Sequence, residues 1–154
     1  MRMVLDILSK CIMVIIAVCI VLAAPIIFGY HPVVVLSPSM EPNYPVGSIT
    51  YYSPCSYEDV QTQDAITFKV SNSLITHRVQ EIDDSAHTFI TKGDNNETVD
   101  INPVEANQLV GKTSSIAIPY AGYLITFIKN WYVIVGMAVI LISSQFLDKN
   151  QEQE

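Results

Sequence analysis

Three short segments of the chain carry residue types that could do nucleophilic and acid–base chemistry. In the first, Ser37 and Ser39 flank Pro38, directly after an apolar run and before Met40. Proline disfavours helix around itself, so both hydroxyls are expected in extended or turn backbone at the end of a strand. A Ser-Pro turn is commonly structural, and a serine hydroxyl becomes a nucleophile only beside a base.

His77 is the candidate base, in the second segment. Alternation along Leu74–Val79 puts His77 on the same strand face as Ile75 and Val79, the face expected to be buried. A partly buried imidazole that is neutral near pH 7 is what a general base requires. The same position also suits a core histidine held by a hydrogen bond.

The third segment is a polar loop, Thr91–Asp100, with two aspartates six residues apart. Either Asp94 or Asp100 could accept a hydrogen bond from an imidazole and so fix its orientation. The simplest alternative is a solvated turn.

A calcium site is a rival interpretation of the same loop. Oxygen-bearing side chains occupy alternate positions, namely Asp94, Asn96, Thr98 and Asp100. Glu105 follows at the twelfth position counted from Asp94. The sixth position, where an EF-hand needs glycine, is Val99, and no helical pattern flanks the loop. We therefore expect no metal site, and no cofactor motif is present.

The cysteines do not predict a disulfide in the middle of the chain. Cys11 and Cys19 lie in the first apolar run, and Cys55 is alone between the two runs. Cys55 as a nucleophile would need a nearby base, and the sequence offers no obvious one.

Residues 31–120 carry the pattern of short β-strands. Turn formers bound six segments rich in β-branched and aromatic residues, namely Val33–Leu36, Ser48–Tyr52, Ala65–Val70, Leu74–Val79, Thr88–Thr91 and Leu109–Ile118. Ser71–Ser73 and Asp83–Ser85 are predicted turns. No helical period of useful length interrupts them. The sequence therefore predicts a compact, mostly antiparallel β domain.

Two apolar runs flank this domain. Cys11–Tyr30 has twenty residues without a charge, about 30 Å of helix and the thickness of a bilayer core. Trp131–Leu147 has seventeen, near the lower limit for a span. The first run is longer than the core of a cleaved signal peptide, and Pro25 would follow the small-residue site, so an uncleaved anchor is expected. Tyr120–Lys129 suits the membrane interface or the start of the second helix.

Charge predicts the orientation of these spans. Arg2 and Lys10 precede the first run, and His31–Thr50 after it contains no Lys or Arg, which favours a cytoplasmic N-terminus. Residues 31–120 hold eleven acids and four bases, which accounts for the net charge of −7 and argues against nucleic acid. We predict a cytoplasmic N-terminus (1–10), a transmembrane helix (11–30), an extracytoplasmic β domain (31–122), an interfacial segment with a second transmembrane helix (123–147) and a cytoplasmic tail (148–154).

Together these segments resemble the type I signal peptidase family, and more specifically the branch shared by archaea, the endoplasmic reticulum and some Gram-positive bacteria. The similarity extends from the first apolar run to the second. The segments that carry it are Ser37–Pro42, Thr76–Val79, and Lys92–Asn96 with Asp100, joined by Pro45–Ile49, Val110–Lys112 and Ile118–Tyr123.

The resemblance implies a role for each candidate residue. The family's nucleophile is the serine directly before the methionine, which here is Ser39. The common bacterial members use a lysine base, whereas this chain has His77 at that place. The third member of the branch's catalytic set corresponds to Asp100, and Asp94 corresponds to an aspartate with a supporting role and stays an alternative orienter of His77. The oxyanion hole would combine the N–H of Ser39 with the hydroxyl of Ser37.

The resemblance thus implies a membrane-bound serine endopeptidase with a signal peptidase-like β fold. It would cleave N-terminal signal peptides from secretory precursors after small residues, and its partners would be these precursors and the lipid bilayer. Nothing in the sequence assigns accessory subunits. A non-catalytic, membrane-tethered β module of a secretion complex is the main alternative. A self-cleaving repressor-type peptidase would share a related fold, but the two apolar runs and the missing DNA-binding segment argue against it.

Overall fold

The computed structural model describes residues 2–149, which divide into two compact units. One unit is Pro25–Tyr123 and contains the strands, whereas the other combines the helical segments that precede and follow it.

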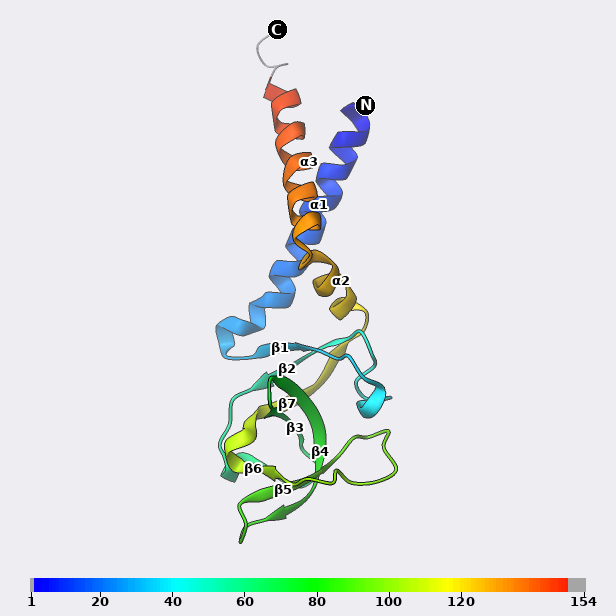
Figure 1. Cartoon of the computed structure of the whole chain (residues 1–154). Helices are drawn as coiled ribbons and strands as arrows, with labels where there is room; N and C mark the ends of the chain where they lie inside the picture. The colour runs from blue at the N-terminus through cyan, green and yellow to red at the C-terminus, as the bar shows by residue number, and fades with distance from the viewer. Residues whose placement is uncertain (1, 150–154) are drawn as a thin grey trace. The chain divides into compact units, whose positions relative to one another are not determined.

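The Pro25–Tyr123 unit is built on one antiparallel sheet (Figure 1). Among the described residues the sheet has seven strands, in the spatial order β1-β2-β7-β3-β4-β5-β6. The strands are β1 His31–Val34, β2 Ile49–Ser53, β3 Ala65–Val70, β4 Ser73–Asp83, β5 Thr88–Lys92, β6 Val104–Glu105 and β7 Leu109–Ile118. The predicted mostly antiparallel β domain is confirmed.

Most strands follow the predicted ones closely, but β1 begins and ends two residues earlier than the predicted Val33–Leu36. β3 and β7 have the predicted bounds, and β4 extends the predicted segment through Asp83. β3 and β4 form a tight hairpin in which Val70 pairs with Ser73. Ser71 takes a positive φ of 54° in this turn, as two-residue hairpins require. β6 was not predicted, because a strand of two residues has too short a pattern to detect.

Two groups of buried apolar side chains hold the sheet together. The larger joins the inner faces of β3, β4 and β5 and consists of Val60, Ile66, Phe68, Val79, Phe89 and Val104. The smaller consists of Met40, Tyr44 and Ala65. It ties the loop that follows β1 to the start of β3, which matters for the site described below.

Gly47 is required by its surroundings in this unit. Gly47 has a φ of +80°, a conformation that L side chains rarely adopt. The Tyr123 ring also fills the space that a side chain at residue 47 would need. A side chain here would therefore displace the aromatic ring and strain the backbone.

The helical unit contains α1 Arg2–Ala23 and α3 Trp131–Lys149, which contact each other (Figure 1). The short 3-10 helix η1 (Ala24–Phe28) continues α1. Over Met3–Phe28 this helix is long and apolar enough to cross a membrane. It begins well before residue 11, the predicted start of the span.

The second apolar run, Trp131–Leu147, lies within one helix, α3, and a separate short helix precedes it. α2 covers Ala121–Ile128 and meets α3 at a bend of 80°, so the pair has the length and composition of a span only if the two count as one. The sequence left open whether the helix starts before or at Trp131, and the structure has a helix on each side of the break. The second span therefore stays a prediction. Residues 150–154 of the predicted tail lie outside the described residues.

Candidate active site

Ser39 lies in a single 3-10 turn, η2 (Pro38–Met40), which begins after a three-residue link from β1. Pro38 starts the turn, where its fixed φ suits a helical conformation. Met40 is only 3% exposed and anchors the turn in the smaller apolar group. The Ser39 carbonyl accepts a hydrogen bond of 2.8 Å from the N–H of Asn95. Burial of the methionine and this bond to the loop after β5 together fix the position of the serine.

His77 lies on β4 with its side chain 12% exposed, and its ring stands edge-on to Phe68. Its Nε2 is 3.2 Å from the Oγ of Ser39, and its Nδ1 is 2.6 Å from Oδ2 of Asp100. An ionised carboxylate can only accept hydrogen bonds, so the proton between these two groups belongs to Nδ1. In a neutral ring, Nε2 then offers its lone pair to the Ser39 hydroxyl, the arrangement that general-base catalysis needs.

Asp100 is held by a second donor, Thr91, which sequence reasoning did not identify as a site residue. The Thr91 hydroxyl donates to the same oxygen, Oδ2, at 2.6 Å, and the Asp100 N–H donates to the Thr91 carbonyl at 2.8 Å. Thr91 is fully buried on β5, on the same face as Phe89. A hydroxyl on the buried face of a predicted strand is the signal that could have found it.

Asp94 has a different set of partners. Arg78 forms two hydrogen bonds of 2.7 Å to its carboxylate, and Asn43 donates a third of 2.7 Å. The Asp94 side chain is 9% exposed and that of Arg78 23%. Burial acts to raise the pKa of Asp94, but the hydrogen bonds from Arg78 and Asn43 and the nearby positive charge outweigh it and hold the pKa below its usual value. The structure thus brings Asp100, and not Asp94, into contact with His77.

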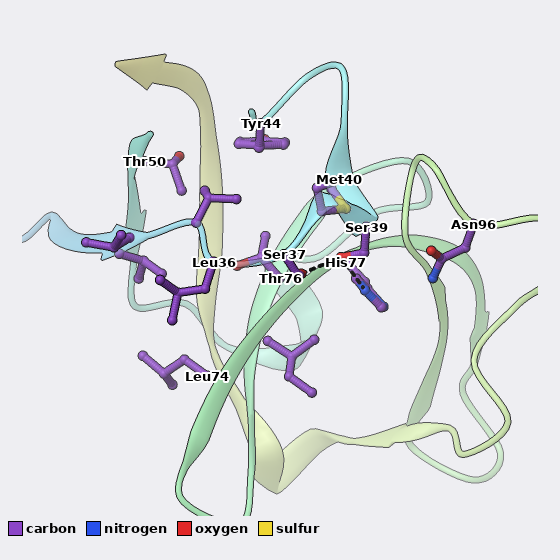
Figure 2. A pocket seen from close by; sticks show the side chains of 14 residues that line it. Leu36, Ser37, Ser39, Met40, Tyr44, Thr50, Leu74, Thr76, His77 and Asn96 are labelled. Atoms are coloured by element: carbon purple, nitrogen blue, oxygen red, sulfur yellow. Dashed lines mark hydrogen bonds between the residues drawn. The ribbon is translucent and has the colours of Figure 1, made fainter. Parts of the chain in front are cut away.

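Ser39 and His77 open onto a cleft of about 340 Å³ (Figure 2). One side of the cleft is the chain from Val33 to Ser37, and the other is the stretch from Leu74 to His77. Figure 2 shows Ser39 and His77 pointing toward each other, with Asn96 beyond the imidazole. The Ser37 hydroxyl lies 3.2 Å from that of Ser39. Both predicted hydroxyls and the candidate base therefore share one cavity.

Both long sides of the cleft are strand edges. Val35 exchanges main-chain hydrogen bonds with Ser48 and Gly47, so the main-chain groups of its neighbours Val34 and Leu36 point the other way, toward the open edge. On β4, the partner β3 covers Ser73 to Arg78, whereas β5 pairs only from Arg78 onward. Within the described chain, residues 74–77 therefore have a strand on one side only. An extended peptide between these edges would find hydrogen-bonding groups on both sides.

The two other candidate chemistries are not assembled at this site. Asp94 and Asp100 face different partners, and among residues 2–149 no group of three His, Cys, Asp or Glu side chains is arranged to hold a metal. Cys55 packs against the larger apolar group and is not among the residues that line the cleft. Burial raises the pKa of its thiol and disfavours the thiolate form.

Comparison with known proteins gives sequence relatives, although no protein-family model matches the chain. It is 34% identical over 99 residues to signal peptidase I W of Bacillus subtilis, which covers 62% of this chain and 52% of that protein. It is 32% identical over 127 residues to the human signal peptidase complex catalytic subunit SEC11C, covering 75% of this chain and 65% of that protein. An uncharacterized protein of Methanocaldococcus jannaschii is 37% identical over 65 residues, 38% of this chain and 32% of that protein.

The chain spans about half to two thirds of the length of the two signal peptidases that it matches. The sequence similarity reaches a bacterial enzyme and a subunit of the eukaryotic signal peptidase complex, and hydrogen bonds join Ser39, His77 and Asp100. The chain belongs to the type I signal peptidase family, in the branch represented by the endoplasmic reticulum and archaea.

Proposed function

We propose that this protein is a membrane-anchored serine endopeptidase that cleaves signal peptides from secretory precursors, with Ser39, His77 and Asp100 as its catalytic residues. The observation that carries the proposal is the hydrogen-bonded series from the Ser39 Oγ through both ring nitrogens of His77 to Asp100. Family membership supports the substrate class, because the similar proteins are named signal peptidases.

In the proposed reaction, Nε2 of His77 takes the proton of the Ser39 hydroxyl as Oγ attacks the carbonyl carbon of the scissile bond. The same proton then passes to the nitrogen of the departing amine as the C–N bond breaks, which leaves an ester on Ser39. Water, deprotonated by His77, hydrolyses that ester and restores the hydroxyl. Asp100 holds the ring in the tautomer that the first step needs and stabilises the imidazolium.

The tetrahedral intermediate needs donors for its negatively charged oxygen. We assign this role to the Ser39 N–H and the Ser37 hydroxyl, whose oxygen lies 3.2 Å from the nucleophile. Loss of one such donor typically costs about 3–4 kcal/mol in the barrier. Asp94 supports the site by fixing the loop after β5 through Arg78 and Asn43.

The precursor segment before the scissile bond binds as a strand between the two open edges. β1 runs toward Ser37 and β4 runs toward His77, so an extended chain between them would end at the nucleophile. A cleft of about 340 Å³ leaves little volume for each side chain, which favours small residues close to the bond.

Two membrane spans with the β domain outside the cytoplasm would bring the site to the end of a translocated signal peptide. The apolar helix over Met3–Phe28 supports the first span, and the joined α2–α3 pair is compatible with a second. Protease added to intact cells should then reach the β domain but not a tag at the C-terminus. Digestion of the tag under these conditions would exclude the two-span topology.

The decisive experiment is cleavage of a secretory precursor by membranes that contain the full chain. Ser39→Ala should lower the rate by at least about 10⁴-fold. Ser115→Ala is the matched control, because Ser115 is an exposed serine of β7 that does not line the cleft. Normal processing by Ser39→Ala in a folded, inserted protein would sink the proposal and favour a non-catalytic module.

A further inference from the structure

A second, larger cleft of about 960 Å³ lies next to the active site. Its apolar floor comes from Phe68, Val70 and Ile75, and its other wall is the loop of residues 95–105. Ile75, His77 and Asn96 line both clefts, and Asp100 lines the second. The two clefts therefore meet at the imidazole of the proposed base.

The proposed reaction indicates where the peptide after the scissile bond leaves the active site. His77 must deliver a proton to the departing amine, so the peptide after the scissile bond leaves the active site beside the imidazole. The first cleft is occupied by the segment before the bond, on the binding mode proposed above. The second cleft is the neighbouring hollow that His77 also lines. By contrast, a third hollow, beside Arg78 and Lys112, contains neither Ser39 nor His77.

The Asp and Glu residues that line the second cleft give it a negative formal charge. Its acids are Glu97, Asp100 and Glu105, and the described residues that line it include no Lys or Arg. Asp100 is engaged by His77 and Thr91. Glu97 and Glu105 are exposed, and Glu105 accepts a hydrogen bond from Asn107. A Lys or Arg side chain could lay its methylene groups on the apolar floor and bring its charge to these acids. A carboxylate there would be repelled.

We propose that the second cleft binds the residues that follow the scissile bond, as an extended peptide, and that Glu97 makes it favour basic over acidic side chains at these positions. This inference rests on the proposed function. It adds a binding site on the departing side of the bond and a charge preference for it.

The test uses the full-length chain in detergent and two fluorogenic peptides. The peptides are identical through the scissile bond, with small residues before it, and carry either two Lys or two Glu at the second and third positions after it. The measured quantity is the ratio of kcat/KM for the Lys peptide to that for the Glu peptide. The whole domain is acidic, so long-range attraction raises this ratio in any case.

The effect of Glu97 is isolated by comparison with a second charge reversal. Glu97→Lys should lower the ratio about two- to fivefold more than Glu58→Lys, which changes the net charge equally but lies outside the cleft. Glu97→Gln should fall between wild type and Glu97→Lys, and high salt should reduce all the differences.

The outcomes separate this inference from the proposed function. If wild type cleaves both peptides but Glu97→Lys and Glu58→Lys change the ratio equally, the inference is overturned while the peptidase stands. If folded wild type cleaves neither peptide and no secretory precursor, the proposed function is wrong, and the inference that rests on it is wrong as well.

Discussion

Removal of the Thr91 hydroxyl tests whether this hydroxyl holds the Asp100 carboxylate in place against His77. The change is Thr91→Val, which keeps the branched shape of this fully buried residue but deletes its hydrogen bond of 2.6 Å to Oδ2 of Asp100. The main-chain bond from Asp100 to the carbonyl of residue 91 does not depend on the side chain and should remain. The carboxylate would then be free to rotate away from His77.

The magnitude follows from the kind of bond that is lost. A hydrogen bond to a charged group contributes about 1.5–3 kcal/mol. If the whole contribution is lost in the transition state, kcat falls about 10- to 100-fold. Thr91 does not line the first cleft, so KM should change little. Thr91→Ser keeps a hydroxyl at the same place and should recover most of the activity.

The assay is steady-state cleavage of a fluorogenic signal-peptide substrate by the three proteins in detergent, with thermal unfolding measured in parallel. A structural role alone would lower the unfolding midpoint and leave the kcat of the folded fraction unchanged. Wild-type kcat in folded Thr91→Val would refute the positioning role. So would a Thr91→Ser variant that folds normally and is as slow as the valine variant.

The remaining predictions concern Asp100, Asp94 and the loop that carries them. Asp100→Asn should lower kcat by up to about 10⁴-fold, because an amide can hold the imidazole in the wrong tautomer, and equal loss in Asp94→Asn would contradict this assignment. Asp94→Asn should instead lower stability by about 2 kcal/mol, since it leaves Arg78 partly buried without its carboxylate partner, and calorimetry in detergent would measure this. The pKa of Asp94 is lowered in the folded state, so its ionised form stabilises the fold. This contribution to the free energy of unfolding is present above about pH 4 and is lost as the pH falls through the lowered pKa. The difference in stability between wild type and Asp94→Asn should therefore close on acidification. Gly93→Ala should reduce cleavage strongly, because the new Cβ would lie 2.6 Å from the Ser39 carbonyl oxygen, whereas Gly136→Ala has open space and should cleave normally.

Local patterns were sufficient to predict most of the sheet. β3 and β7 have the bounds expected from their β-branched residues and flanking turn formers, because alternation is a property of neighbouring residues. The extension of β4 through Asp83 was not predicted, because it depends on pairing with β5, a contact between segments that local patterns do not report. The break between α2 and α3 lies at Lys129 and Asn130, where the sequence left the helix start open.

For the candidate site too, some features could be predicted from the sequence and others only from the structure. The sequence alone was enough to single out Ser39, His77 and the loop with its two aspartates, because their residue types and order along the chain are local features. Only the tertiary structure decided which carboxylate lies against the imidazole, that Thr91 holds it, and that two clefts meet there.

The physical reason is the pleat of β4. His77 and Arg78 are consecutive, so their side chains point to opposite faces of the strand. The loop after β5 passes Asp94 to the Arg78 face and Asp100 to the His77 face. That assignment depends on the register in which Arg78 pairs with Lys92, and pairing across fourteen residues is decided by the packed sheet and not by the segment itself.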